Sequence, residues 1–250
     1  MSSPLNTPCN NWLDDVVAAV SVAPYYRDDA VVIFNADCKE IVPQMPKACL
    51  LLTDPPYGLA DKHNGGGGKG KSSWTHLPSV AQSFDMQRPD PAVFRMMLDA
   101  SANQIVWGGN YFADLLPPSM GWLVWDKGLH GFTTSDFEMA WTSWRRAARR
   151  FEYCCSNERG FAPGSDEPRF VINCHPTQKP LRLMSWCIGL AGDVQTILDP
   201  FAGSGTTGRA AKDLGRKAVL IEREEKYCEI AANRMRQEVL PLDFTETHNA

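Results

Sequence analysis

The sequence lacks several features that would each point to a definite class of protein. Its 8 cysteines include no Cys-x-x-Cys pair, so neither a zinc-ligand set nor a small disulfide-stapled fold is indicated. No apolar stretch approaches the length of a membrane span, and Met1–Asn10 carries no basic segment followed by an apolar run, so we expect no membrane association and no signal peptide. We therefore expect a cytoplasmic protein with reduced, mostly buried thiols.

The chain also lacks an overall basic charge, since its formal net charge is -4. Any contact with nucleic acid must then come from a local basic surface. With 250 residues, 44% of them hydrophobic and 22% charged, the chain is expected to fold as a single domain over residues 1–250 with a proper core.

Short apolar runs rich in β-branched residues alternate with helical patterns, which predicts an α/β fold with a mostly parallel sheet and helices on its faces. Seven strands are expected near Val31–Phe34, Ala48–Thr53, Gln104–Trp107, Trp122–Trp125, Phe137–Trp141, Gln195–Leu198 and Lys217–Glu222. Helices are expected near Pro91–Ala102, Leu181–Ala191, Thr206–Leu214 and Glu224–Glu238.

Two segments interrupt this alternation. Residues 58–87 contain a run of glycines and lysines, so we expect a mobile loop that closes over a ligand. Residues 145–170 open with a run of arginines that helical spacing would gather into a basic stripe. The basic residues expected to bind DNA phosphates are Lys69, Lys71, Arg145, Arg146, Arg149 and Arg150.

The first candidate site follows the apolar run Leu50–Thr53. The residues of this turn are Asp54, Pro55, Pro56 and Tyr57. Two prolines make the turn rigid, and ligands of open α/β sheets bind at such carboxyl ends of strands. An exocyclic amine of a nucleobase is a poor nucleophile, because its lone pair is delocalised. Acceptors on Asp54 and on the Pro55 carbonyl would localise that lone pair, and Tyr57 offers a stacking face.

The second candidate site is a strand, a glycine-rich turn and a helix. The residues of the turn and the helix start are Asp199, Pro200, Phe201, Ala202, Gly203, Ser204, Gly205, Thr206 and Thr207. The glycines let the backbone approach a ligand, and the helix N-terminus suits an anion such as a carboxylate. Glu222 ends the next strand, where it could accept from ribose hydroxyls, with Arg223 beside it.

Together these motifs resemble the DNA amino-methyltransferases, which act on N6 of adenine or N4 of cytosine. Asp54–Tyr57 is similar to their catalytic motif, and Asp199–Gly205 is similar to their cofactor motif. His175–Pro180 resembles a further element that precedes the cofactor motif, and the order of the motifs resembles that of the β class. Asn35–Cys38 resembles the segment whose acidic residue faces the cofactor adenine.

The resemblance implies a seven-stranded, mostly parallel, Rossmann-like methyltransferase sheet, circularly permuted, with helices on both faces. It implies S-adenosylmethionine as the cofactor, no metal, and double-stranded DNA from which the target base is flipped out. Asp37, Cys38 and Lys179 join the expected cofactor residues, with Lys179 anchoring a loop over the cofactor or reaching a DNA phosphate. The resemblance also implies a target-recognition insert at residues 145–170, and because this insert is short, a homodimer could supply further DNA-binding surface.

The residues leave several functions open. Adenine N6 is preferred because Asp at the first motif position is commoner in the adenine enzymes, with cytosine N4 as the alternative. Methylation of a protein glutamine or an RNA base, and a non-catalytic DNA-binding regulator, are further readings. Methylation at carbon 5 of cytosine is not indicated, because no Pro-Cys nucleophile follows the catalytic strand. A restriction system, a phage and a solitary regulator all remain open as the biological setting.

Overall fold

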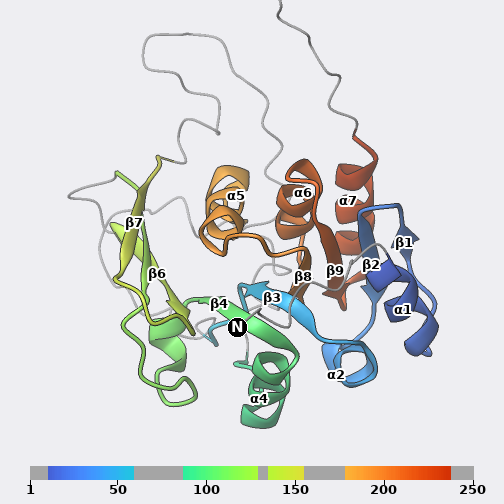
Figure 1. Cartoon of the computed structure of the whole chain (residues 1–250), viewed down its shortest axis with the longest axis horizontal. Helices are drawn as coiled ribbons and strands as arrows, with labels where there is room; N and C mark the ends of the chain where they lie inside the picture. Colours follow the sequence, from blue (N-terminus) through green and yellow to red (C-terminus); the bar gives the residue numbers. More distant parts are fainter. Residues whose placement is uncertain (1–10, 59–86, 129–134, 155–177, 238–250) are drawn as a thin grey trace, which may run out of the picture.

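The computed structural model describes residues 11–58, 87–128, 135–154 and 178–237. Nine strands of these residues form one sheet in the order β1-β2-β9-β8-β3-β4-β6-β5-β7, which Figure 1 shows with β1 and β7 at opposite ends. The strands are β1 (Tyr26–Arg27), β2 (Val31–Asn35), β3 (Ala48–Thr53), β4 (Ser101–Trp107), β5 (Leu123–Asp126), β6 (Phe137–Thr142), β7 (Arg149–Glu152), β8 (Thr196–Asp199) and β9 (Lys217–Glu222).

The seven expected strands are confirmed, and they form the central part of the sheet from β2 to β5. The expected strand number of seven is too low for this sheet, because β1 and β7 add one strand at each edge. β1 is only two residues long, and β7 begins inside the arginine run. Edge strands of this kind carry too few apolar residues to produce a hydrophobic pattern.

Five neighbouring strands, β2, β9, β8, β3 and β4, run parallel. β6 then pairs antiparallel with both β4 and β5, whereas β7 pairs parallel with β5. Parallel strands are buried on both faces, which explains why they read as nearly continuous apolar runs in the sequence.

Helices cover both faces of the sheet (Figure 1). One face carries α5 (Leu181–Leu190), α6 (Thr206–Asp213) and α7 (Glu225–Arg236), and the other carries α1 (Trp12–Ala19), α2 (Cys38–Ile41) and α4 (Pro91–Asp99) with the short 3-10 helices η2 (Val42–Gln44) and η5 (Gly109–Phe112).

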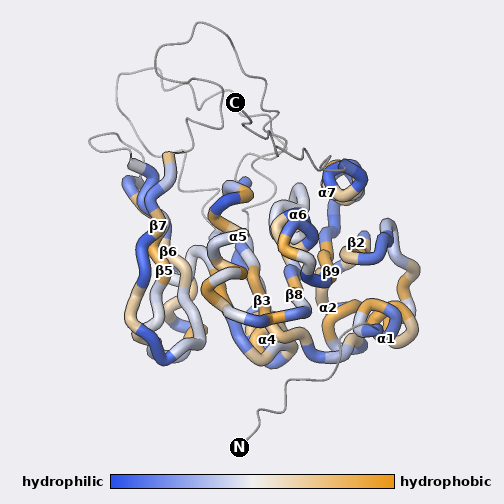
Figure 2. Tube along the Cα trace, turned by 45° about the horizontal axis from the view of Figure 1, so that its top comes forward, coloured by the Kyte–Doolittle hydropathy of each residue, from blue (hydrophilic) through white to orange (hydrophobic). Residues whose placement is uncertain are grey.

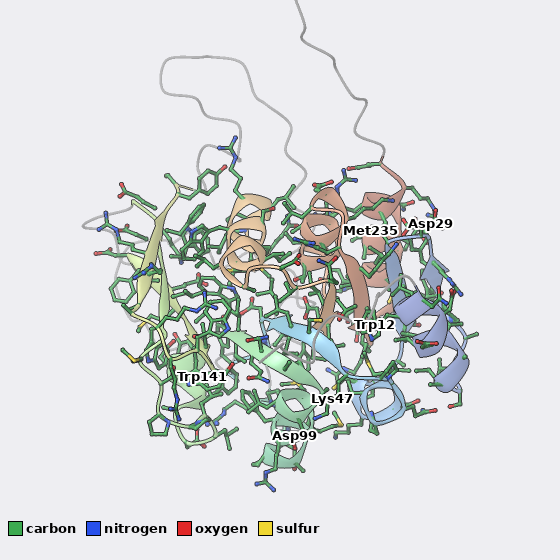
Figure 3. The ribbon with its side chains drawn as sticks, in the orientation of Figure 1. Trp12, Asp29, Lys47, Asp99, Trp141 and Met235 are labelled. Carbon is green, nitrogen blue, oxygen red and sulfur yellow. The ribbon has the colours of Figure 1, made fainter. Side chains whose placement is uncertain are left out.

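Alternate residues of each central strand enter different cores. In β3, Leu50 and Leu52 pack toward α5 and α6, whereas Leu51 packs toward α1, α2 and α4. Figure 2 shows β3 and β9 largely in the hydrophobic colour, and Figure 3 shows side chains filling the layers on both sides of the sheet. The sheet is therefore held rigidly between two apolar cores.

The predicted helix boundaries needed one substantial correction. The helix expected over Pro91–Ala102 ends at Asp99, because Ser101 already pairs with Ala48 and begins β4. The sequence did not predict α1, α2 or the two 3-10 helices. α2 is only one turn long, and so its apolar periodicity is too short to detect.

The arginine run is not helical, contrary to expectation. Arg149 and Arg150 lie in β7, and their backbone pairs with Leu123 and Val124 of β5. The expected loop over 58–87 and the expected insert over 145–170 fall mostly outside the described residues, at 59–86 and 155–177. Lys69 and Lys71 belong to these segments, as do the first three residues of His175–Pro180. Among the helices that the structure describes, none has both the length and the apolar character that a membrane crossing requires.

Candidate active site

The two predicted turns meet at one edge of the sheet. β3 and β8 are parallel neighbours, with Leu50 opposite Ile197 and Leu51 opposite Leu198. The turns that follow them therefore emerge side by side, although they lie more than 140 residues apart in sequence. The Thr53 hydroxyl donates a hydrogen bond of 2.8 Å to Oδ1 of Asp199, which ties the end of one strand to the end of the other.

A cleft of about 680 Å³ opens where these turns meet. Its walls come from the catalytic turn, the glycine-rich turn, the start of α2, the end of β9 and the segments before α4 and α5. All the expected catalytic and cofactor residues except Gly205 line it, namely Asp37, Cys38, Asp54, Pro55, Pro56, Tyr57, Lys179, Asp199, Pro200, Phe201, Ala202, Gly203, Ser204, Thr206, Thr207, Glu222 and Arg223.

Both carboxylate oxygens of Asp54 are engaged. Oδ1 accepts from the Tyr57 hydroxyl, and Oδ2 accepts from Nζ of Lys179 at 2.5 Å. The same ammonium lies 3.3 Å from the Tyr57 oxygen. Burial raises the pKa of Asp54 above its usual value of 3.8, although the charge of Lys179 opposes this shift. The site therefore holds a desolvated carboxylate against an ammonium.

Lys179 is buried against two carboxylates, an arrangement that does not favour the expected alternative of contact with a DNA phosphate. Its side chain is only 6% exposed, and its Nζ also lies 3.1 Å from Oε2 of Glu138. Burial by itself would lower the pKa of Lys179, but the adjacent Asp54, Tyr57 and Glu138 raise it well above the usual value. Lys179 is consequently a fixed positive charge inside the site.

Glu138 was not predicted from the sequence. It stands in β6, and its second oxygen pairs with Nζ of Lys127 at 2.7 Å. Burial would raise the pKa of Glu138, but the ammonium groups of Lys179 and Lys127 lower it to about 2. The signal that could have revealed it is a carboxylate within the otherwise apolar run Phe137–Trp141.

Aromatic rings pack around Tyr57. Its ring stacks on Tyr111 with centroids 4.7 Å apart and meets the edge of Phe112 at 6.0 Å. Tyr111 and Phe112 belong to η5, which follows the paired glycines after β4. Tyr57 is thus held between its hydroxyl contact with Asp54 and a ring stack.

Asp199 is buried, and its carboxylate binds the glycine-rich turn through hydrogen bonds. Its Oδ1 accepts from the backbone N–H of Phe201 at 3.2 Å as well as from Thr53, and Oδ2 accepts from the Thr207 hydroxyl at 2.6 Å. Burial raises the pKa of Asp199 to about 6, against which these hydrogen bonds act. Asp199 therefore fixes the turn from beneath.

Glu222 holds the same turn from the side. Its Oε2 accepts from the N–H of Gly203 at 2.9 Å, and Oε1 accepts from the N–H of Glu224 at 2.9 Å. Each carboxylate oxygen has a further lone pair, so Glu222 can still accept from a ligand in the cleft. Gly205 has a φ of +78° and an added Cβ would lie 2.7 Å from Cβ of Ala231, so only glycine fits where α6 begins.

Asp37 both caps a helix and lines the cleft. The Asp37 carboxylate caps α2 by accepting from the N–H of Lys39 at 2.9 Å, and Asp37 also lines the cleft. Cys38 is buried beside it, and burial raises the pKa of its thiol to about 12, which keeps the thiol neutral.

A polar latch joins the segment before α5 to the glycine-rich turn. Oε1 of Gln178 accepts from the Ser204 hydroxyl at 3.0 Å and from Nη2 of Arg234 at 3.1 Å. Arg234 also donates to the Thr206 hydroxyl at 2.7 Å. Gln178 lies inside a predicted motif, but Arg234 lies in α7 and carried no sequence signal.

The arginines expected to contact DNA do not line the cleft. All four are exposed, on the turn before β7 and on β7 itself. Arg150 lies 2.7 Å from Glu152 and 3.5 Å from Asp126, and the guanidinium of Arg146 lies over the Trp144 ring at 4.3 Å. Arg88 is a basic residue that does line the cleft, where it pairs with Asp114 at 2.7 Å.

Comparison with known proteins agrees with this arrangement. The family model N6_N4_Mtase, described as DNA methylase, matches residues 106–233. The chain belongs to this DNA methylase family. It is a DNA amino-methyltransferase of the β class, and the predicted resemblance is confirmed.

Two curated relatives are similar over most of their length. The type II methyltransferase M2.LlaDCHI of Lactococcus lactis subsp. cremoris is 26% identical, covering 85% of this chain and 91% of its own. The type II methyltransferase M2.DpnII of Streptococcus pneumoniae is also 26% identical, covering 86% and 93%.

Two solved structures share the fold. The PvuII DNA methyltransferase, titled cytosine-N4-specific, aligns with a TM-score of 0.58 at 14% identity over 88% of this chain and 92% of its own. The M1.HpyAVI–SAM complex aligns with a TM-score of 0.51 at 22% identity over 82% and 99%. The expected Rossmann-like α/β architecture is confirmed.

Proposed function

We propose that this DNA methyltransferase transfers the methyl group of S-adenosylmethionine to N6 of an adenine flipped out of double-stranded DNA. The observation that carries the proposal is that the carboxylate of Asp54 and the glycine-rich turn at Gly203 line one cleft. An amine held at Asp54 and a nucleoside held at Gly203 would then be close enough to react.

The residues of the cleft fit S-adenosylmethionine. Glu222 and Asp37 can accept from ribose hydroxyls or the adenine amine, and the half-buried ring of Phe201 can pack on the nucleoside. Gly203 and Gly205 keep side chains away from the start of α6, where backbone N–H groups favour a carboxylate. When bound, S-adenosylmethionine supplies an electrophilic methyl group on its sulfonium.

Asp54 and the Pro55 carbonyl act as acceptors for the two N–H bonds of the target amine. Localising the lone pair makes the amine nucleophilic, and the negative charge of Asp54 stabilises the positive charge that develops on nitrogen. Asp54 need not remove a proton first, because the proton can leave after the methyl has been transferred. Tyr57 provides the face on which the flipped base stacks.

Adenine is proposed over cytosine on the first residue of the catalytic motif. Asp54 stands where the cytosine-N4 enzymes more often carry Ser, and this is an association within the family. Both amines need the same acceptors, so cytosine N4 is the competing function. This chain shares its fold with the cytosine-N4-specific PvuII enzyme.

Transfer of labelled methyl groups tests the proposal. The protein is incubated with labelled S-adenosylmethionine and with DNA, RNA or protein, and the DNA is then digested to nucleosides and analysed by mass spectrometry. We expect label only in DNA, as N6-methyladenine, and none with Asp54→Ala. N4-methylcytosine would support the competing function, and full activity of Asp54→Ala would refute the catalytic assignment.

We also propose that the chain acts as a homodimer, because the recognition insert expected over residues 145–170 is short in sequence and a second copy would add DNA-binding surface. Sedimentation of the protein with and without a DNA duplex tests this. A species of one chain per duplex that still methylates DNA would refute it.

A further inference from the structure

The geometry points to a role for Glu138 that neither the motifs nor the family assignment supply. We propose that Glu138 is a positioning residue, which holds the ammonium group of Lys179 when the target amine takes its place at Asp54. The inference rests on the proposed function, since it requires Asp54 to be the acceptor of the target amine.

Lys179 occupies a hydrogen-bonding position that the substrate needs. Its Nζ donates to Oδ2 of Asp54 at 2.5 Å, and the Tyr57 hydroxyl donates to Oδ1. In the described site, Asp54 therefore already accepts a hydrogen bond from an ammonium nitrogen. This nitrogen takes the place that the amino nitrogen of the substrate would take. For the target amine to bind Asp54, the bond from Lys179 must lengthen or break.

A buried ammonium that lost its only partner would be costly. Lys179 does not face that cost, because Oε2 of Glu138 lies 3.1 Å from the same Nζ. This buried oxygen accepts no geometrically regular hydrogen bond among the described residues, so it has capacity to take a full bond. A small movement of Nζ from Asp54 toward Glu138 exchanges one carboxylate for the other.

Glu138 is placed to do this without touching the substrate. It stands in β6 opposite Trp125, and it does not line the cleft, whereas Lys179 does. Lys127 holds its other oxygen at 2.7 Å and so fixes the carboxylate in place. Lys179 therefore lies between a carboxylate that faces the cleft and one that stands behind it.

The charges around Glu138 favour a role in holding Lys179 over a role in accepting a proton. Lys179 and Lys127 lower the pKa of Glu138 to about 2, so Glu138 is a poor acceptor for the proton released after methylation. The charged groups that face Asp54 are Lys179, Glu138 and, beyond Thr53, Asp199, with the phenol of Tyr57 also in contact. Substitutions at Lys179 and Glu138 should then shift the pKa of Asp54 in opposite directions.

The sign of each shift follows from charge. In Lys179→Gln, Asp54 loses its counter-charge beside Glu138, so its pKa rises and the acid limb of the rate profile moves to higher pH. In Glu138→Gln, a like charge is removed and Lys179 binds Asp54 alone, so the acid limb moves to lower pH. At neutral pH the Glu138→Gln rate should fall about tenfold, the effect of one stronger hydrogen bond to a charged group.

The experiment measures single-turnover methylation of a DNA duplex from pH 5 to pH 9 for the full chain and its variants. Glu229→Gln, on the exposed face of α7, is the matched control and should keep the wild-type profile. Lys127→Gln retains Glu138 but frees it to hold Lys179 more strongly, so its acid limb should move upward. This variant tests the idea independently if Glu138→Gln does not fold.

The outcomes separate the two proposals. Opposite movements of the acid limb in Lys179→Gln and Glu138→Gln support the role of Glu138. The role is overturned if the acid limb moves in the same direction in both of these variants. It is also overturned if the acid limb stays at the wild-type pH in these two variants or in Lys127→Gln. If Asp54→Asn retains the wild-type rate, the proposed function has failed instead, whatever the other variants do.

Discussion

Gly108 and Tyr57 are in such close contact that no other residue fits at position 108. A Cβ atom added to Gly108 would lie 2.0 Å from Cε1 of Tyr57, and the backbone of Gly108 has a φ of +67°. Only glycine meets both conditions without strain. Gly108, the first of the two glycines after β4, therefore leaves the space that the Tyr57 ring occupies beside Asp54.

Replacing Gly108 by alanine should displace that ring and weaken the stacking of the target base. Stacking of a base on an aromatic side chain contributes about 1–3 kcal/mol, so we expect the methylation rate to fall about ten- to hundredfold. Binding of S-adenosylmethionine, measured by calorimetry, should change little.

Gly215→Ala is the control for this substitution. Gly215 also has a φ of +67°, but an added Cβ there would meet no atom within 4 Å. It should therefore show the cost of the backbone conformation without the clash. Equal losses of activity in the two variants would mean that the contact with Tyr57 is unimportant.

The stability of the protein should depend on pH through Asp199. Its pKa is raised by burial from 3.8 to about 6, so the folded form binds a proton more tightly than the unfolded form. Stability should then increase as the pH falls through 6, and the gain is complete below 3.8. From pH 8 to pH 5 the contribution is about 1.4 kcal/mol.

Asp199→Asn removes this titration. The free energy of unfolding in urea, measured at pH 8 and pH 5, should change less between the two conditions in the variant than in the wild type. The difference between the proteins isolates Asp199 from the other buried carboxylates. An identical pH dependence in both would show that Asp199 does not titrate in this range.

Gln178 should support cofactor binding, because it joins the segment before α5 to the glycine-rich turn. Gln178→Ala removes the acceptor for Ser204 and for the guanidinium of Arg234. We expect the Kd for S-adenosylmethionine to rise about tenfold. Gln195→Ala removes an amide whose bond to Asp193 is exposed, so its Kd should match the wild type. Matching values for both variants would exclude the latch.

The central strands and both turns were predictable from the sequence for a physical reason. Parallel strands such as β3 and β8 are buried on both faces, so they read as apolar runs, and a polar turn after such a run marks the binding edge. The edge strands β1 and β7 were not predictable, since they bury little and carry charged residues.

The contacts made by Lys179 could not be predicted from sequence patterns. Lys179 precedes α5, Glu138 is in β6 and Lys127 follows β5. The antiparallel pairing of β5 with β6 brings Lys127 to Glu138, and the segment before α5 brings Lys179 to the same carboxylate. Sequence motifs indicate residues that contact ligands. An ion pair between elements that are distant in the sequence leaves no periodic pattern, so the sequence does not reveal it. The structure was needed to show that Lys179 is buried at Asp54.

The arginines near β7 offer the remaining test, since their contact with DNA is a prediction from the sequence. Arg145 and Arg149 are exposed, and neither has an acidic partner in an ion pair among the described contacts. Arg150, by contrast, is paired with Glu152 and Asp126. If the first two bind phosphates, each alanine substitution should weaken DNA binding irrespective of sequence.

Counterion release gives this prediction a quantitative form. Each phosphate contact contributes about 0.9 to the slope of log Kd against log salt, so Arg145→Ala and Arg149→Ala should each lower that slope by about 1. Arg150→Ala should have a smaller effect, because its charge is already compensated. Arg236→Ala, on α7 at the far end of the sheet from β7 (Figure 1), should leave the slope unchanged. A slope that is the same in all four variants would place the DNA elsewhere, and Arg88 in the cleft would then be the next residue to test.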